Sequence, residues 1–270
     1  MKGEQARTLT NEAIEKLAKA LDAGQSCALT AFLAAAARFH RYTFRNVMLI
    51  AMQRPDATRV AGFNAWKKLG RFVKKGEKGI VIVAPIPFRR DTGDAEQEAE
   101  GGIRFKAAYV FDVAQTDGEP LPELAKVSGN PGEHLERLKA AIVDRTITLN
   151  YLADLGGPEG QSHGGRIDIL AGLTPAHEFE VLAHELAHEL LHHAGTERAV
   201  RDVRELEAEA VAFIVCEAVG LESTHAACDY IQLYRGDRET LEASLERIQG
   251  AAHAVLERVL IAETTSAQES

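Results

Sequence analysis

The stretch Glu178–His193, EFEVLAHELAHELLHH, decides how the second half of the chain is organised. It contains HELAH, in which His184 and His188 are four residues apart. Side chains at this spacing share one face of an α-helix, so both imidazoles can reach one ion. Glu185 is then placed beside the ion to take a proton from a metal-bound water. The stretch predicts a metal-holding helix, and zinc suits imidazole and carboxylate ligands with one open position.

A second HExxH overlaps the first, because His188–His192, HELLH, repeats the pattern one helical turn later. Both registers cannot hold the same catalytic metal. A helix rich in His, Glu and Leu also produces this short pattern by chance, so a ligand from elsewhere has to decide. In the first register, His192 and His193 are ordinary residues of a helix end, where the macrodipole favours them.

The third ligand is expected on a second helix, Arg204–Gly220, RELEAEAVAFIVCEAVG. Thermolysin-like zinc proteases take their third ligand from a Glu on such a helix, and an acidic residue four positions later holds a zinc-binding His. The segment ELEAE resembles that arrangement. The resemblance implies Glu205 as the ligand and Glu209 as the residue that holds His184. The reverse assignment of the two carboxylates stays open.

The separation along the chain distinguishes the two registers. Glu205 follows His188 by seventeen residues, a normal distance for two helices joined by a turn. It follows His192 by only thirteen, which is tight for two helices to turn back. The first register is therefore preferred.

Charge divides the chain into two parts. From Arg38 to Arg90 there are thirteen Lys or Arg and two acidic residues, a local net charge of +11. Residues 126–270 hold twelve Lys or Arg and twenty-five acidic residues, a local net charge of −13. The 270 residues are 46% hydrophobic, which is enough for one large or two modest domains. We therefore expect two domains with different functions.

Composition also bears on location. No apolar run approaches the roughly 20 residues of a membrane span, and Met1 leads into polar sequence unlike a signal peptide. The three cysteines, Cys27, Cys216 and Cys228, are odd in number and unpatterned, as in a reduced cytosol. These features predict a cytoplasmic protein with no membrane partner.

Periodicity and turn residues predict an α+β fold in two domains. Residues 1–122 are expected to form a small mixed nucleic-acid-binding domain and residues 123–132 a linker. Residues 133–262 are expected to form a mostly helical, zincin-like domain with a short sheet, and residues 263–270 a disordered tail. Arg166–Leu170 follows a glycine-rich loop, residues 156–165, and precedes the HExxH helix. It is expected to be the sheet edge along which a peptidase lays an extended substrate.

The basic stretch alternates cations with aromatic rings, which are scarce elsewhere in the chain. Cations that follow phosphates and rings on which bases stack are what single-stranded nucleic acid binding requires, although several of these rings must belong to the core. The predicted DNA-binding residues are Arg41, Tyr42, Arg45, Asn46, Trp66, Lys67, Lys68, Arg71, Lys74, Lys75 and Lys78.

Four motifs follow one another here: Tyr42–Gln53 (YTFRNVMLIAMQ), Ala61–Arg71 (AGFNAWKKLGR), Lys75–Gly79 (KGEKG) and Val110–Thr116 (VFDVAQT). In this order they closely resemble the N-terminal domain of ArdC-type antirestriction proteins. That family joins a single-stranded-DNA-binding domain to a zinc-metallopeptidase-like domain. The second half of the chain is similar to the same family, and also to ImmA/IrrE metallopeptidases, which often continue HExxH with Leu-Leu-His. The resemblance covers nearly the whole chain and implies carriage by mobile DNA, as in plasmid conjugation.

Two functions are compatible with these features. The first is a zinc-dependent metalloendopeptidase, acting on an unknown protein and guided by bound single-stranded DNA. The second is a DNA-binding protein that shields strands, while its metal domain is structural or lacks turnover. A third interpretation is an ImmA-like regulator that cleaves a repressor and whose N-terminal domain contacts protein.

Overall fold

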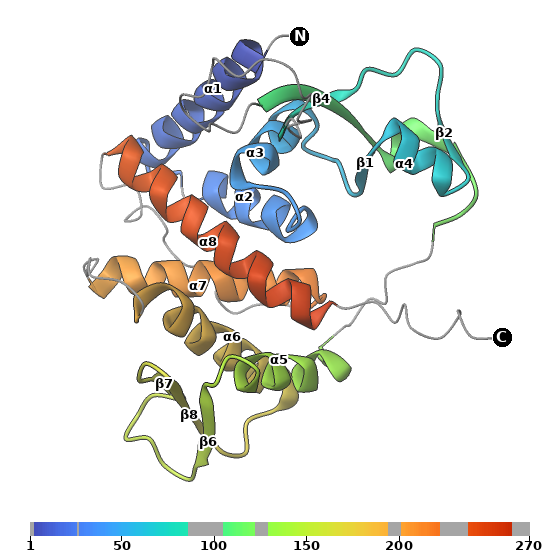
Figure 1. Ribbon diagram of the computed structural model, residues 1–270. Helices are drawn as coiled ribbons and strands as arrows, with labels where there is room; N and C mark the ends of the chain where they lie inside the picture. Colours follow the sequence, from blue (N-terminus) through green and yellow to red (C-terminus); the bar gives the residue numbers. More distant parts are fainter. Residues whose placement is uncertain are drawn as a thin grey trace, which may run out of the picture. The chain divides into compact units, whose positions relative to one another are not determined.

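The computed structural model describes residues 3–25, 27–85, 105–121, 129–193, 201–221 and 237–260 (Figure 1). Within them, helices combine with small sheets, which confirms the predicted α+β class. The chain packs as two compact units. Unit 1 takes residues 1–16 and 45–122, and unit 2 takes residues 17–44 and 123–270, so α1 (Gly3–Asp22) is divided between them.

The compact units do not follow the predicted domain boundaries throughout. Residues 17–44 belong to unit 2, where α2 (Cys27–Arg38) packs against α7 (Arg201–Ala218). Residues 123–128 of the predicted linker and the whole tail after residue 262 lie outside the described residues. The functional division of the chain at residues 122 and 133 stays a prediction.

Unit 1 is built on a three-stranded antiparallel sheet in the order β1–β4–β3, beside a two-stranded ribbon of β2 and β5. Its elements are α3 (Phe44–Gln53), β1 (Val60–Gly62), α4 (Phe63–Lys68), β2 (Arg71–Val73), β3 (Ile80–Pro85), β4 (Phe105–Asp112), the 3-10 turn η1 (Val113–Gln115) and β5 (Thr116–Gly118).

Two amide side chains of α3 pair with the outer edge of β3. The Asn46 amide donates to the Val83 carbonyl at 2.9 Å and accepts from the Val83 N–H at 2.8 Å. Gln53, two helical turns later, does the same at Val81, with both distances 2.9 Å. An edge strand leaves such backbone groups without a partner strand, and here the helix satisfies them. The motif Tyr42–Gln53 therefore joins helix to sheet.

The motif Val110–Thr116 joins loops through two buried polar residues. The Asp112 carboxylate accepts from the N–H groups of Thr58, Arg59 and Ala114. The Gln115 side chain caps η1 by accepting from the Asp112 N–H, and it donates to the Lys78 carbonyl at 2.9 Å. A buried polar group is costly unless it is hydrogen-bonded, so these residues fix the loops around the sheet.

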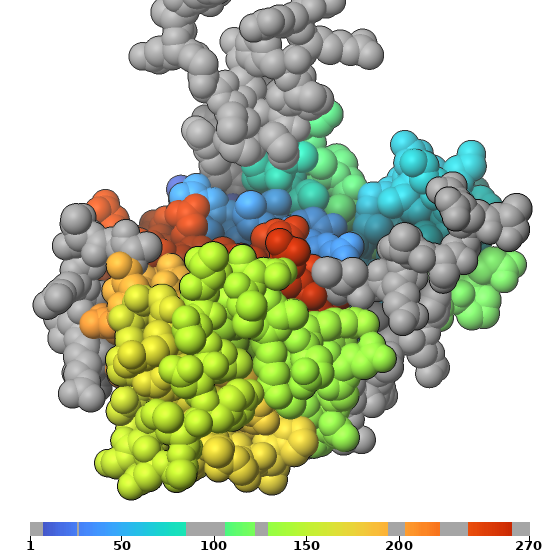
Figure 2. All heavy atoms as spheres, turned by 60° about the horizontal axis from the view of Figure 1, so that its bottom comes forward, coloured from blue at the N-terminus to red at the C-terminus, as the bar shows by residue number. Residues whose placement is uncertain are grey.

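Unit 2 sets a helical layer beside a small sheet. α6 packs on α7, α7 on α8, and α5 on both α6 and α8 (Figure 1). The elements are α2, α5 (Glu133–Val143), β6 (Thr148–Leu152), β7 (Gly160–Ser162), β8 (Arg166–Leu170), α6 (Pro175–His192), α7 and α8 (Arg238–Val259). Figure 2 shows α5 and the sheet segment, yellow-green to yellow, on the near face of this unit.

The sheet of unit 2 differs from the expectation in one respect. Its order is β6–β8–β7, with β8 parallel to β6 and antiparallel to β7. β8, Arg166–Leu170, is therefore the central strand, and the prediction that it forms the substrate edge is wrong. The edge strands are β6 and β7, and β7 lies inside the segment predicted to be a glycine-rich loop.

α6 begins where the sequence indicates. Thr174 caps it by accepting from the His177 N–H, and Pro175 occupies the first turn, where its missing N–H costs nothing. Phe179, Leu182 and Leu186 are fully buried, so this face anchors α6 in the core and leaves another face for chemistry. In the described parts of the chain, none of the helices has the length and apolar character to cross a membrane.

Candidate functional site

Two helices of unit 2 bring three ligand atoms together. His184 and His188 come from α6 and Glu205 from α7, and the ligand atoms of the three lie within 4.8 Å of one another. The two Nε2 atoms are 3.0 Å apart, and Glu205 Oε2 is 3.3 Å from His188 Nε2 and 3.7 Å from His184 Nε2. Ligands about 2.0–2.1 Å from a tetrahedral metal lie roughly 3.4 Å from each other. The donor set therefore fits a divalent metal ion.

Electrostatics favours the ligand forms of these groups. A hydrogen bond from His184, followed by the nearby His188, lowers the pKa of Glu205 to about 2, despite partial burial. Burial lowers the pKa of His188 to about 4, and the neighbouring His184 adds to this shift. Metals bind carboxylates and neutral imidazoles, so Glu205 and His188 are in ligand-competent forms at neutral pH.

Glu185 lies beside this group, beneath β7. Its side chain is buried, which raises its pKa to about 7, and it accepts a hydrogen bond from the Ser162 N–H. A Cβ added at Gly160 would lie 2.7 Å from Glu185 Cγ and 2.8 Å from its Oε1. Only glycine allows the strand to approach the carboxylate this closely.

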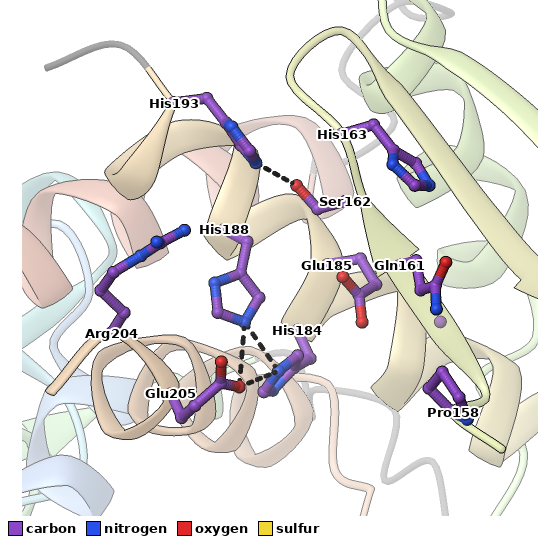
Figure 3. A pocket seen from close by; sticks show the side chains of 11 residues that line it. Pro158, Gln161, Ser162, His163, His184, Glu185, His188, His193, Arg204 and Glu205 are labelled. Atoms are coloured by element: carbon purple, nitrogen blue, oxygen red, sulfur yellow. Dashed lines mark hydrogen bonds and ion pairs between the residues drawn. The ribbon is translucent and has the colours of Figure 1, made fainter. Parts of the chain in front are cut away.

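The group opens into a pocket of about 390 Å³ between β7, α6 and α7. Figure 3 shows the imidazoles of His184 and His188 and the carboxylate of Glu205 turned toward one another, with Glu185 facing β7. Arg204, one residue before Glu205, lines the same pocket. The lining residues are Pro158, Gly160, Gln161, Ser162, His163, His184, Glu185, His188, His193, Arg204 and Glu205.

Glu189, the Glu of the second HExxH motif, binds the turn that follows β7. The Glu189 carboxylate accepts from Ser162 Oγ at 2.7 Å and from the N–H groups of His163, Gly164 and Gly165 at 3.1, 2.8 and 2.6 Å. Burial alone would raise its pKa, but these donors outweigh burial and hold the pKa below its usual value. Glu189 therefore fastens the turn after β7 to α6, which places β7 over Glu185.

His192 and His193, which follow the first HExxH motif, make specific contacts beyond those of ordinary helix-end residues. His193 Nε2 lies 2.8 Å from Ser162 Oγ, so His193 supports the same turn. His192 lies behind the ligands and contacts His188 and Glu207. Glu209 is half-buried and is not in the converging group found in the described part of the chain. Sequence reasoning gave no role to Ser162, Glu189 or Glu207, whose partners lie on other elements.

The predicted DNA-binding residues fall into two classes. Asn46 and Trp66 are buried, and their polar atoms bind the backbone at Val83 and Phe111. The Arg71 guanidinium, from Nε through both terminal nitrogens, donates to Thr116 Oγ1 and to backbone carbonyls of β5 and its end. These three side chains support the fold of unit 1.

The remaining predicted residues are exposed, except the half-buried Tyr42. They are Arg45, Lys67, Lys68, Lys74, Lys75 and Lys78 in unit 1, and Arg41 with Tyr42 in unit 2. Lys74 is partly engaged, because its Nζ contacts the Ala114 carbonyl at 3.1 Å and Asp117 at 3.5 Å.

Three large rings of unit 1 are exposed to solvent. They are Phe63, Phe72 and Tyr109, at 55%, 58% and 47%. Phe63 and Lys67 are one turn apart on α4, so this ring and this cation share a face of the helix. A Cβ on Gly79, next to Lys78 in the sequence, would lie 3.0 Å from Tyr109 Cβ and Cδ1. Tyr109 was not singled out from the sequence, because it lies in an apolar strand.

Comparisons with known proteins agree with this architecture. Residues 4–111 match the family described as the N-terminal domain of anti-restriction factor ArdC. An uncharacterized Bacillus anthracis protein is 26% identical over 274 residues, covering 83% of this chain and 46% of that protein. The chain thus spans about half the length of this curated relative.

A solved structure shows a similar fold. The metal-free crystal structure of the antirestriction ArdC protein from the R388 plasmid is 20% identical, with a TM-score of 0.55. The match covers 93% of this chain and 98% of that one. The Mn(II)-bound structure of that protein, also 20% identical, matches 85% of this chain and 98% of that one, with a TM-score of 0.49.

Proposed function

We propose that this chain, whose residues 4–111 match the N-terminal domain of anti-restriction factor ArdC, binds single-stranded DNA through unit 1 and cleaves a protein through a zinc site in unit 2. The proposed role is antirestriction during the entry of mobile DNA. The observation that carries the enzymatic part is the convergence of His184, His188 and Glu205 beside the buried Glu185.

His184, His188 and Glu205 would hold the metal through Nε2, Nε2 and Oε2. A bound zinc ion would supply an acidified water and polarise a substrate carbonyl. Other divalent ions accept the same ligand types, so zinc is proposed on the tetrahedral fit and the imidazole-rich donor set.

Glu185 would move the protons of the reaction. Its carboxylate shares the pocket with the three ligands, and the Ser162 N–H and the close approach of Gly160 hold it in place. From there it can take a proton from the attacking water and return it to the leaving amine, as general base and then general acid. Removal of a group in this role typically costs 10²–10⁴-fold in rate.

The substrate that best fits the pocket is an extended peptide. β7 lines the pocket and is an edge strand of its sheet, so its outer side has no partner among the described strands. An extended segment can pair with such an edge through backbone hydrogen bonds. Such pairing would bring a peptide carbonyl toward Glu185 without any demand on side-chain identity.

The DNA-binding part rests on the exposed rings and cations of unit 1. Bases can stack on Phe63, Phe72 and Tyr109. Lys67, one helical turn after Phe63, and the exposed Lys78 can meet phosphates. Asn46, Trp66 and Arg71 support this surface from within the unit.

The test compares Glu185→Gln with wild type in the full chain. The variant should keep its metal and its affinity for a single-stranded oligonucleotide, but it should no longer protect unmodified DNA that enters a restricting host. Unchanged protection would eliminate the peptidase and favour the alternative in which the protein shields strands. No oligonucleotide affinity in the wild type would favour a repressor-cleaving regulator instead.

A further inference from the structure

A buried polar row lies behind the metal ligands, away from the pocket. The His192 side chain on α6 is 4% exposed and that of Glu207 on α7 is 1% exposed. His192 Nδ1 is 2.9 Å from His188 Nδ1, and His192 Nε2 is 3.1 Å from Glu207 Oε2. Neither His192 nor Glu207 lines the pocket. The row starts at a proposed ligand and continues into the core.

α8 completes the row. The Arg247 guanidinium donates to Glu207 Oε1, and also to Ser244 Oγ at 3.1 Å. A carboxylate as buried as Glu207 is costly unless it is paired and hydrogen-bonded, and here it meets an imidazole and a guanidinium. Both carboxylate oxygens of Glu207 are therefore engaged, one on each side of the row.

A metal bound to His188 Nε2 would determine which ring nitrogen carries the proton in His188 and in His192. The neutral His188 must then carry its proton on Nδ1, and that N–H can only donate to His192 Nδ1. His192 must in turn carry its proton on Nε2, where it donates to the Glu207 carboxylate. The polar atoms match one another without a conflict, in the tautomers that ligation requires.

We propose that His192, Glu207 and Arg247 are positioning residues that hold His188 in its ligand tautomer and orientation and so strengthen metal binding. The inference rests on the proposed metal site. It also assigns the overlapping second HExxH. Its last His supports a ligand, and Glu189 fastens the strand over Glu185, so neither residue belongs to a competing metal register.

The experiment measures Co²⁺ and Zn²⁺ affinity of the full chain against a competing chelator, with the Co²⁺ absorption band as the spectroscopic signature. Glu207→Gln and His192→Leu should weaken binding by about 10- to 100-fold, the usual cost of removing such a partner. His192→Asn keeps an acceptor near the position of Nδ1 but breaks the link to Glu207, so its effect should be smaller. Glu246→Gln, the same kind of substitution at an exposed α8 position, should change nothing.

Thermal unfolding separates positioning from a merely structural role. A metal that binds only the folded state raises the melting temperature by an amount set by its Kd. That increment should shrink in Glu207→Gln and His192→Leu, whatever the melting temperature of the metal-free variant.

Two outcomes would overturn the proposal in different ways. Affinities within twofold of wild type in both variants, with binding still abolished in His184→Ala, would refute the positioning role and leave the metal site intact. No metal uptake by the wild type, or uptake that His184→Ala leaves unchanged, would refute the proposed site itself and the positioning role with it.

Discussion

The pocket of unit 2 and the part of the basic stretch that lies in unit 1 use polar side chains in opposite ways. In the pocket, His184, His188 and Glu205 from two helices point at one spot, and their neighbours fix their positions. In the basic stretch, the charges are spread over a surface. Arg71, which looks like the other cations in sequence, is bound to the backbone of its own unit. Convergence can be read from helical spacing, whereas the availability of a surface charge depends on partners that spacing does not reveal.

Removing the metal is the strongest test of whether the pocket of unit 2 and the basic surface of unit 1 act independently. If the proposed function is right, a chelator should abolish peptidase activity, because the bound ion would supply the acidified water. It should leave oligonucleotide affinity unchanged, because unit 1 contributes none of the three proposed ligands. Activity and affinity are measured on the same preparation before and after metal restoration. A parallel decline of both would show that the two regions are not independent.

Gly160→Ala tests whether the close approach of β7 to Glu185 matters for activity. Its Cβ would lie 2.7 Å from Glu185 Cγ and 2.7 Å from Val181 Cγ1, so β7 or Glu185 must shift. A displacement of about 1 Å can cost 10²-fold in rate, and a reduction of that order is expected in kcat/KM. Gly250→Ala is the control, since no atom lies within 4 Å of its added Cβ. Equal activity in the two variants would contradict the placement of β7.

Neutralising four exposed lysines tests the surface of unit 1. Lys67, Lys68, Lys75 and Lys78 changed together to Gln should reduce the slope of log affinity against log salt by about 0.7 for each phosphate that is no longer neutralised. Titration of an oligonucleotide at several salt concentrations measures this slope. An unchanged slope would mean that these four lysines do not contact phosphates and that DNA binds elsewhere on the chain.

A pair of single variants distinguishes a cation that supports the fold from one that is expected to bind DNA. Arg71→Gln removes charged donors to Thr116 and the β5 backbone, so it should lower the free energy of unfolding by about 1–3 kcal/mol. Lys67→Gln should leave stability nearly unchanged and weaken DNA binding instead. Denaturant unfolding and oligonucleotide titration measure the two effects. Exchanged effects would reverse the roles given to these residues.

Sequence alone predicts much of the helical frame and the three converging side chains that are proposed as metal ligands. α6 carries its own cap in Thr174 and Pro175, and its buried face has clear helical spacing. The preference for the His184/His188 register over the His188/His192 register followed from chain separation, and the ligand atoms of the three predicted residues do converge. These features are local, or depend on one helix meeting its next neighbour.

Features set by distant partners were not predictable. β7 is only three residues, Gly-Gln-Ser, without apolar alternation, and it becomes a strand because β8 and Glu189 hold it. Glu207 is two residues from a proposed ligand, yet its role depends on Arg247, forty positions later. The resemblance to ArdC-type proteins did not indicate which of the conspicuous polar residues support the fold.

Metal stoichiometry of the purified chain, measured for wild type beside His184→Ala, tests the central claim most directly. We expect one tightly bound zinc ion per wild-type chain, with two imidazoles and one carboxylate as protein ligands by X-ray absorption. We expect no bound zinc in His184→Ala. A wild type without stoichiometric metal, or a variant that retains it, would contradict the claim that α6 and α7 build a metal centre.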